Sequence, residues 1–65
     1  MHISVNGEVE QIEPQSLESY LSHKLLLGRR IAVERNGDIV PKSQFSDVIL
    51  KDGDVLEIVH AIGGG

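Results

Sequence analysis

The residues with the clearest chemical potential stand at the end of the chain. Its 65 residues finish on Gly63, Gly64 and Gly65, directly after the strand-like run 55–61. Because glycine has no Cβ, such a segment can take any backbone angle and enter a channel that side chains would block. The composition also fits a frayed terminus or a cloning remnant. The functional interpretation is a terminal carboxylate presented to another protein's active site.

That carboxylate cannot react unaided. A free α-carboxylate has a normal pKa of about 3.3 to 3.7, so it is ionised near neutral pH and is a poor electrophile. No lysine or helix follows the glycines in this sequence, so we do not expect them to form a phosphate-binding loop. We therefore expect a partner to supply the leaving group, after which a sulfur nucleophile could form a terminal thiocarboxylate.

The histidines do not form a metal-binding pattern. His2, His23 and His60 are far apart in the sequence, and the chain has no cysteine. Zinc sites need closely spaced nitrogen and sulfur ligands, so no metal site is predicted. His60 lies five residues before the end of the chain, and we interpret it as a solvent-facing histidine of a strand and not as a metal ligand or catalytic residue.

We interpret the serine before the helix and the acidic residues as structural. Ser16 precedes a helical pattern, where a serine caps exposed amides, so we interpret it as a helix cap and not as a nucleophile. No apolar residues enclose the early glutamates, so they indicate a solvated sheet edge. Asp52 and Asp54 flank a glycine in a predicted turn, without the later ligands of a calcium loop. The early glutamates are Glu8, Glu10 and Glu13.

Composition limits the class of protein. A 40% hydrophobic content with only Tyr20 and Phe45 as aromatics predicts one small domain with a core of Ile, Val and Leu. The net charge of −4 opposes nucleic-acid binding and favours partners with basic docking surfaces. No basic leader or long apolar run is present, so we expect a soluble cytoplasmic protein without a membrane partner.

The first half of the chain predicts a hairpin and a helix. Residues 1–5 alternate as a strand, and Asn6-Gly7 favours a tight turn into an acidic edge strand over residues 8–12. A helix should begin after Ser16 and end at Gly28. Its apolar stripe is predicted to contain Leu17, Tyr20, Leu21 and Leu25.

The second half predicts three further strands. Residues 31–35 form a strand, and Asn36-Gly37 turns the chain into a short edge strand, 39–41. A helical turn over 42–47 should bury Phe45, and a turn at 51–54 precedes the last strand, 55–61. We expect this last strand to be central, parallel to the first, and to need apolar residues on much of both faces.

These elements predict an α+β fold of the ubiquitin-like β-grasp type. One main helix should pack across a mixed sheet of four to five strands. The domain is expected to span residues 1–62, and residues 63–65 are expected to form a flexible tail.

The chain resembles the ThiS family of sulfur carriers in thiamine biosynthesis over its whole length. Each matching segment is weak alone, but their order and spacing are specific. The segments are Val5-Asn6-Gly7, the helix 17–25, Ile31 to Asn36, Ile39-Val40-Pro41-Lys42, Asp52-Gly53-Asp54, and Glu57 to Gly65. The family often has arginine where this chain has Lys42, so a planar two-pronged contact at that position is in doubt.

The resemblance implies a carrier that is not itself an enzyme. A ThiF-like, E1-like enzyme would adenylate Gly65 with ATP and Mg²⁺, while the carrier itself binds no cofactor. Sulfur from a donor such as a cysteine desulfurase pathway would give the thiocarboxylate, and a ThiG-like thiazole synthase would use it. Gly63 and Gly64 would form the slender lead-in, and Ile62 and His60 would contact partners.

Three alternatives stay open from the sequence. A small subunit of molybdopterin synthase would share the fold and the Gly-Gly end, but is typically longer. A ubiquitin-like modifier would pass the activated Gly65 to an amine. A passive interaction domain would not use its tail at all.

Overall fold

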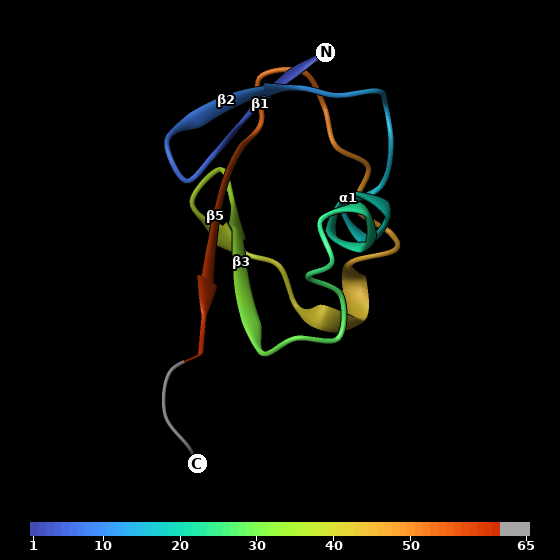
Figure 1. Cartoon of the computed structure of the whole chain (residues 1–65), viewed down its shortest axis with the longest axis vertical. Helices are drawn as coiled ribbons and strands as arrows, with labels where there is room; N and C mark the ends of the chain where they lie inside the picture. Colours follow the sequence, from blue (N-terminus) through green and yellow to red (C-terminus); the bar gives the residue numbers. More distant parts are fainter. Residues whose placement is uncertain (62–65) are drawn as a thin grey trace.

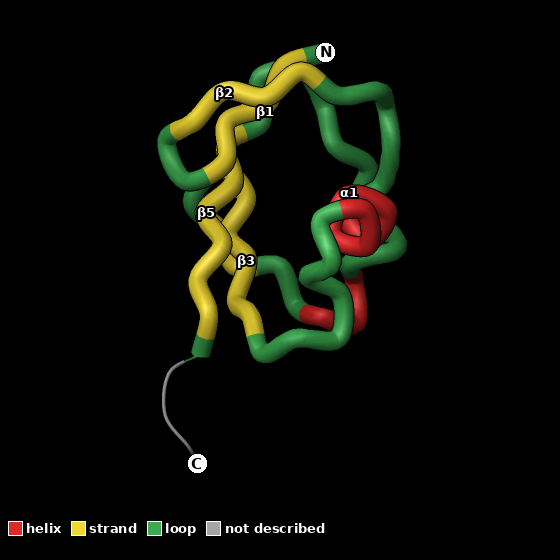
Figure 2. The backbone as a smooth tube through the Cα atoms, in the orientation of Figure 1, coloured by secondary structure: helices red, strands yellow, loops and turns green. Residues whose placement is uncertain are grey.

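The computed structural model describes residues 1–61 as one five-stranded sheet with a helix on one face (Figures 1 and 2). The strand order is β2-β1-β5-β3-β4. This mixed sheet with its single α-helix confirms the predicted β-grasp plan. The elements are β1 (His2–Val5), β2 (Glu8–Gln11), α1 (Leu17–His23), β3 (Ile31–Arg35), β4 (Asp38–Ile39), the short 3₁₀ helix η1 (Lys42–Gln44) and β5 (Val55–His60).

Both Asn-Gly pairs form the predicted tight turns. Asn6 and Gly7 have φ angles of 50° and 86°, and Asn36 and Gly37 have φ angles of 52° and 90°. Two successive positive φ angles match the right-handed twist of the flanking strands. The turns join β1 to β2 and β3 to β4 as antiparallel pairs, which leaves β2 and β4 at the two edges of the sheet.

Strand β5 is central, as predicted. It runs parallel to β1 and antiparallel to β3, with a register that extends from Ile31 opposite His60 to Arg35 opposite Leu56. However, only one face of β5 is covered. Leu56 and Ile58 are buried beneath α1, whereas Val55 and Val59 are 45% and 59% exposed. The expected need for apolar residues on both faces was wrong, because a single helix can cover only one side.

The helix begins where the sequence predicts and ends earlier. The Ser16 hydroxyl accepts a hydrogen bond from the Ser19 amide at 3.0 Å, which confirms the cap. The helix ends at His23 and not at Gly28, because Leu25 adopts a left-handed φ of 60°. The Leu26 amide then bonds to the Leu21 carbonyl at 2.8 Å, an arrangement that closes many helices.

This early ending changes which leucine reaches the core. Leu25 is 77% exposed, so its predicted place on the apolar stripe was wrong. Leu26 packs against the core in its stead. A left-handed residue rotates the chain off the helical period, so the spacing that predicts a continuous stripe no longer applies.

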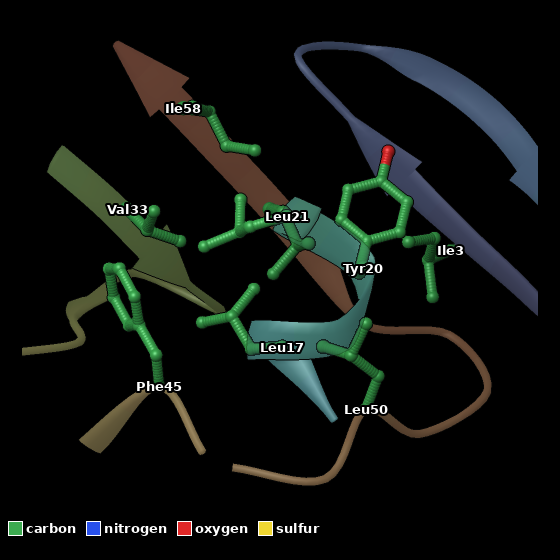
Figure 3. Packing of buried hydrophobic residues seen from close by; sticks show 9 residues of the cluster. Ile3, Leu17, Tyr20, Leu21, Val33, Phe45, Leu50 and Ile58 are labelled. Carbon is green, nitrogen blue, oxygen red and sulfur yellow. The ribbon is translucent and has the colours of Figure 1, made fainter. Parts of the chain in front are cut away.

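The core lies between the sheet and the elements that cover its inner face (Figure 3). Leu17 and Leu21 of α1 point toward Val33 and Ile58 of the sheet, and Phe45 closes the end beyond η1, as the sequence predicts. Burying each large side chain contributes about 1.5 to 3 kcal/mol to stability. The full cluster is Ile3, Leu17, Tyr20, Leu21, Val33, Phe45, Leu50, Leu56 and Ile58. No helix among residues 1–61 is long and apolar enough to cross a membrane.

Candidate functional site

The candidate site begins where β5 ends. His60 pairs with Ile31, and the amide of Ala61 donates to the carbonyl of Arg30 at 2.8 Å. This end of β5 is opposite the N-terminus along the long axis of the molecule (Figure 1). His60 is exposed, which confirms its solvent-facing placement. The predicted partner contact Ile62 and the glycines Gly63, Gly64 and Gly65 lie outside the described residues, so their roles stay predictions.

Two asparagine side chains fix β5 from both sides. On the β1 side, the Asn6 side chain accepts from the Ile58 amide at 2.7 Å and donates to the Ile58 carbonyl at 3.1 Å. On the β3 side, the Asn36 side chain accepts from the Val55 amide at 2.9 Å. The sequence identifies both residues only as turn formers. Their bonds to β5 connect residues far apart in the chain, and no local signal predicts them.

A buried carboxylate secures the start of β5. Asp54 is 6% exposed and accepts hydrogen bonds from Arg35 Nε at 2.9 Å, Asn36 Nδ2 at 3.1 Å and the Lys51 amide at 2.9 Å. Burial alone would raise the pKa of Asp54, but these bonds and the Arg35 charge outweigh it and hold the pKa below its ordinary value. The turn predicted at this position therefore also contains a buried ion pair that fixes the start of β5.

A second polar group joins α1 to β2. The Tyr20 hydroxyl donates to Glu10 Oε1 at 2.9 Å, and Lys24 Nζ lies 3.1 Å from the same oxygen. Burial, the hydrogen bond to Glu10 and the charge of that carboxylate all raise the pKa of Tyr20. Glu10 was predicted as part of a solvated edge, but the structure gives it a specific partner in the helix.

The remaining candidates are placed apart. His2, His23 and His60 lie on three different elements, β1, α1 and β5. Within the described part of the chain, no pocket and no group of three metal-type ligands is found. The described residues offer a firmly held strand that leads toward residue 62, and the role of the glycines that follow it stays a prediction.

The known proteins similar to this chain include two thiazole synthases and a sulfur carrier. The chain is 44% identical over its full length to a thiazole synthase of Paramagnetospirillum magneticum, of which it spans 20%. It also spans 20% of the thiazole synthase of Magnetococcus marinus, with 38% identity. The sulfur carrier protein ThiS of Bacillus subtilis is 40% identical over 77% of this chain and 76% of that protein.

The fold comparison agrees with these relatives. The crystal structure of a thiamine biosynthesis protein, ThiS, from Geobacter metallireducens matches over 100% of both chains, with a TM-score of 0.86 and 30% identity. The ThiS family model matches residues 3–65, a range that includes the three glycines. The chain belongs to the ThiS family, and its sheet and helix are those of that family's ubiquitin-like β-grasp fold.

Proposed function

We propose that this chain carries sulfur on the carboxyl group of Gly65 for thiazole formation in thiamine biosynthesis. The Gly65 carboxylate attacks the α-phosphorus of ATP, and pyrophosphate leaves. A sulfur donor at the sulfide level then attacks the acyl carbon, and AMP leaves with one of the former carboxylate oxygens. The product is a thiocarboxylate, a soft nucleophile that can pass its sulfur onward.

One observation carries this proposal. Strand β5 is paired on both sides, is held by Asn6 at Ile58, and leads directly into the Ile62-Gly63-Gly64-Gly65 sequence. A firmly held strand that is followed, after Ile62, by three glycines suits the delivery of a carboxyl group into a partner's active site. The family match, which extends through Gly65, supports the same use.

The proposal assigns catalysis to partners. A ThiF-like, E1-like adenylyltransferase uses ATP and Mg²⁺, and a cysteine desulfurase pathway with a thiol reductant supplies sulfide equivalents. A ThiG-like thiazole synthase accepts the sulfur, in keeping with the names of two relatives. The setting is cytoplasmic. The ThiS relatives favour this branch over a molybdopterin synthase subunit.

Intact mass spectrometry tests the proposal. The chain is incubated with the ThiF-like enzyme of its source genome, ATP, Mg²⁺ and a sulfide donor, and we expect a mass shift that corresponds to one oxygen replaced by sulfur. A matched variant with one alanine added after Gly65 should show no shift. Wild-type chain that stays unmodified while the Bacillus subtilis carrier is converted by its own enzyme would contradict the proposal. A ladder of lysine conjugates in cell extract would favour the ubiquitin-like modifier.

A further inference from the structure

The outer face of the sheet, opposite α1, is not covered by any described element (Figure 2). Four large apolar side chains lie exposed on this face. Their positions follow from the strand register, because each faces away from its buried neighbours. They are Val9 at 72%, Ile39 at 62%, Val59 at 59% and Val55 at 45% exposure.

Two carboxylates lie side by side in the middle of this face. Glu34 of β3 is directly opposite Glu57 of β5 in the antiparallel register. Each alternates with a buried neighbour, Val33 and Ile58 respectively, so both side chains point outward. Like charges in directly opposite positions destabilise a sheet. Within residues 1–61, the ion pairs formed are Lys24 with Glu10 and Arg35 with Asp54, so neither glutamate gains a compensating cation.

Apolar side chains surround this pair. Val55 and Val59 lie two positions to either side of Glu57 on β5, and Ile39 is opposite Glu34 on β4. A protein that covered these side chains would exclude water from the two carboxylates. Their attraction for a cation would then be much stronger than in water. The arrangement matches a docking centre in which charged groups are enclosed by an apolar ring.

We propose that this face docks a partner protein that places an arginine, set in an apolar surface, between Glu34 and Glu57. A guanidinium offers donors on two sides and is more weakly hydrated than an ammonium group, so it fits between two carboxylates at low desolvation cost. The inference rests on the proposed function in one respect: the partner is the enzyme that adenylates Gly65.

The location of the pair supports this choice of partner. Glu57 and Val59 belong to β5, the strand that continues toward Gly65. An enzyme seated on this face therefore holds the same strand whose extension it must receive. Docking here would orient the reacting carboxyl group before any contact with the glycines.

Charge disfavours other occupants. A second copy packed on this face around a two-fold axis would bring four carboxylates together between chains of net charge −4. Nucleic acids and anionic membranes would be repelled by the same pair. A basic, partly apolar protein surface is the complementary choice.

The test compares two variants of equal net charge. Glu34→Gln combined with Glu57→Gln removes the pair, and Glu13→Gln combined with Glu18→Gln removes two exposed acids of the connection before α1 and of α1 itself. Steady-state pyrophosphate release by the ThiF-like enzyme is measured against carrier concentration. We expect the pair variant to raise KM about 10-fold or more with little change in kcat. The control variant should match wild type, and only wild type and control should weaken steeply with added salt.

Stability separates lost docking from misfolding. Removing the like-charge pair should leave the midpoint of urea unfolding unchanged or slightly higher, so stability and docking move in opposite directions. A pair variant that is adenylated with the wild-type KM would overturn the inference while leaving the proposed function intact. Sedimentation provides a second check. If the wild type self-associates and the pair variant does not, the inference is also overturned, because the occupant of this face would then be a second copy.

A binding measurement without ATP distinguishes a failure of the docking inference from a failure of the proposed function. Isothermal titration calorimetry of wild type, pair variant and control with the same enzyme measures docking alone. If wild type binds but is never adenylated, the proposed function fails and the loss of binding in the pair variant still supports docking. If wild type does not bind the enzyme at all, the inference is wrong.

Discussion

The Asn6 side chain forms two hydrogen bonds with the backbone of Ile58, which lies 52 positions later in the sequence. It accepts from the Ile58 amide at 2.7 Å and donates to the Ile58 carbonyl at 3.1 Å. The side-chain amide of Asn6 therefore makes the hydrogen bonds to β5 that the backbone of one further β1 residue would otherwise have made. The chain can therefore turn back at Asn6-Gly7 while β5 stays paired beyond Leu56. The same residue thus closes a hairpin and secures the strand that leads to the glycines.

Replacing Asn6 should separate these two roles. Asn6→Gly keeps a residue that tolerates the positive φ but removes both bonds to Ile58, and we expect a loss of about 1–2 kcal/mol in the free energy of unfolding. Asn6→Ala should cost about 1 kcal/mol more, because a Cβ disfavours the left-handed region. Urea unfolding measures both. Equal stabilities for the two variants would mean that the backbone angle contributes nothing.

Asp54 should make stability depend on pH in the acid range. Burial would raise its pKa, but the bonds from Lys51, Asn36 and Arg35 lower it below the ordinary 3.8. The ionised form is therefore favoured by folding, and its contribution is fully present above pH 3.8 and is lost as the pH falls through the lower, folded-state pKa. Asp54→Asn should lose about 2–4 kcal/mol at pH 7.

The pH dependence of that variant provides the check. The difference in unfolding free energy between wild type and Asp54→Asn should shrink as the pH falls below 3.8, because both side chains are then uncharged. Urea unfolding at pH 7, 5 and 3 measures it. A difference that stays constant down to low pH would show that the Asp54 charge contributes nothing.

Tyr20 should ionise only at unusually high pH. Burial, the hydrogen bond to Glu10 and the charge of Glu10 raise its pKa above 10.0. Its contribution to stability is thus complete below pH 10.0 and declines as the pH rises toward the folded-state pKa. The chain has one tyrosine and no tryptophan, so tyrosinate absorbance reports this group alone.

The variant Glu10→Gln tests the cause. It removes the negative charge but keeps an acceptor for the Tyr20 hydroxyl, so the absorbance titration should move to lower pH without reaching the free-tyrosine value. Glu8→Gln, on the same strand, is the matched control and should leave the titration in place. An unchanged titration in Glu10→Gln would assign the raised pKa to burial alone.

Leu25 offers a stabilising substitution. It has a φ of 60° and is 77% exposed, so it combines backbone strain with little burial. Leu25→Gly should raise the free energy of unfolding by about 0.5–1 kcal/mol, because glycine takes the left-handed angle without a Cβ penalty. Leu27→Gly, at a leucine without a positive φ, should lower stability. Thermal unfolding of both variants decides the matter, and a destabilised Leu25→Gly would contradict the argument.

Local chemistry made much of this fold predictable. Asn-Gly has few favourable conformations outside tight turns, so both hairpins were placed correctly from two residues each. Ser16 was identified as a cap for the same reason, since its hydroxyl needs only the amide three positions later.

The errors arose where packing overrode a local pattern. The helix stops at His23 because burying Leu26 against the core outweighs the cost of a left-handed Leu25, a comparison that no window of sequence contains. The apolar run in β5 predicted two covered faces, whereas the number of covering elements depends on the whole chain. Glu10 was read as an edge acid because its partners come from α1, 10 positions away in the case of Tyr20.

By itself the sequence determined the elements, their order and the identity of the residue proposed to react, because turns, caps and a glycine run depend on near neighbours. Tertiary structure alone decided that Asn6 holds Ile58, that Arg35 neutralises Asp54, and that Glu34 faces Glu57. Each of these relations joins residues on different elements, so it exists only once the strand register is fixed. Register is set by how the whole core packs, which short-range chemistry cannot specify.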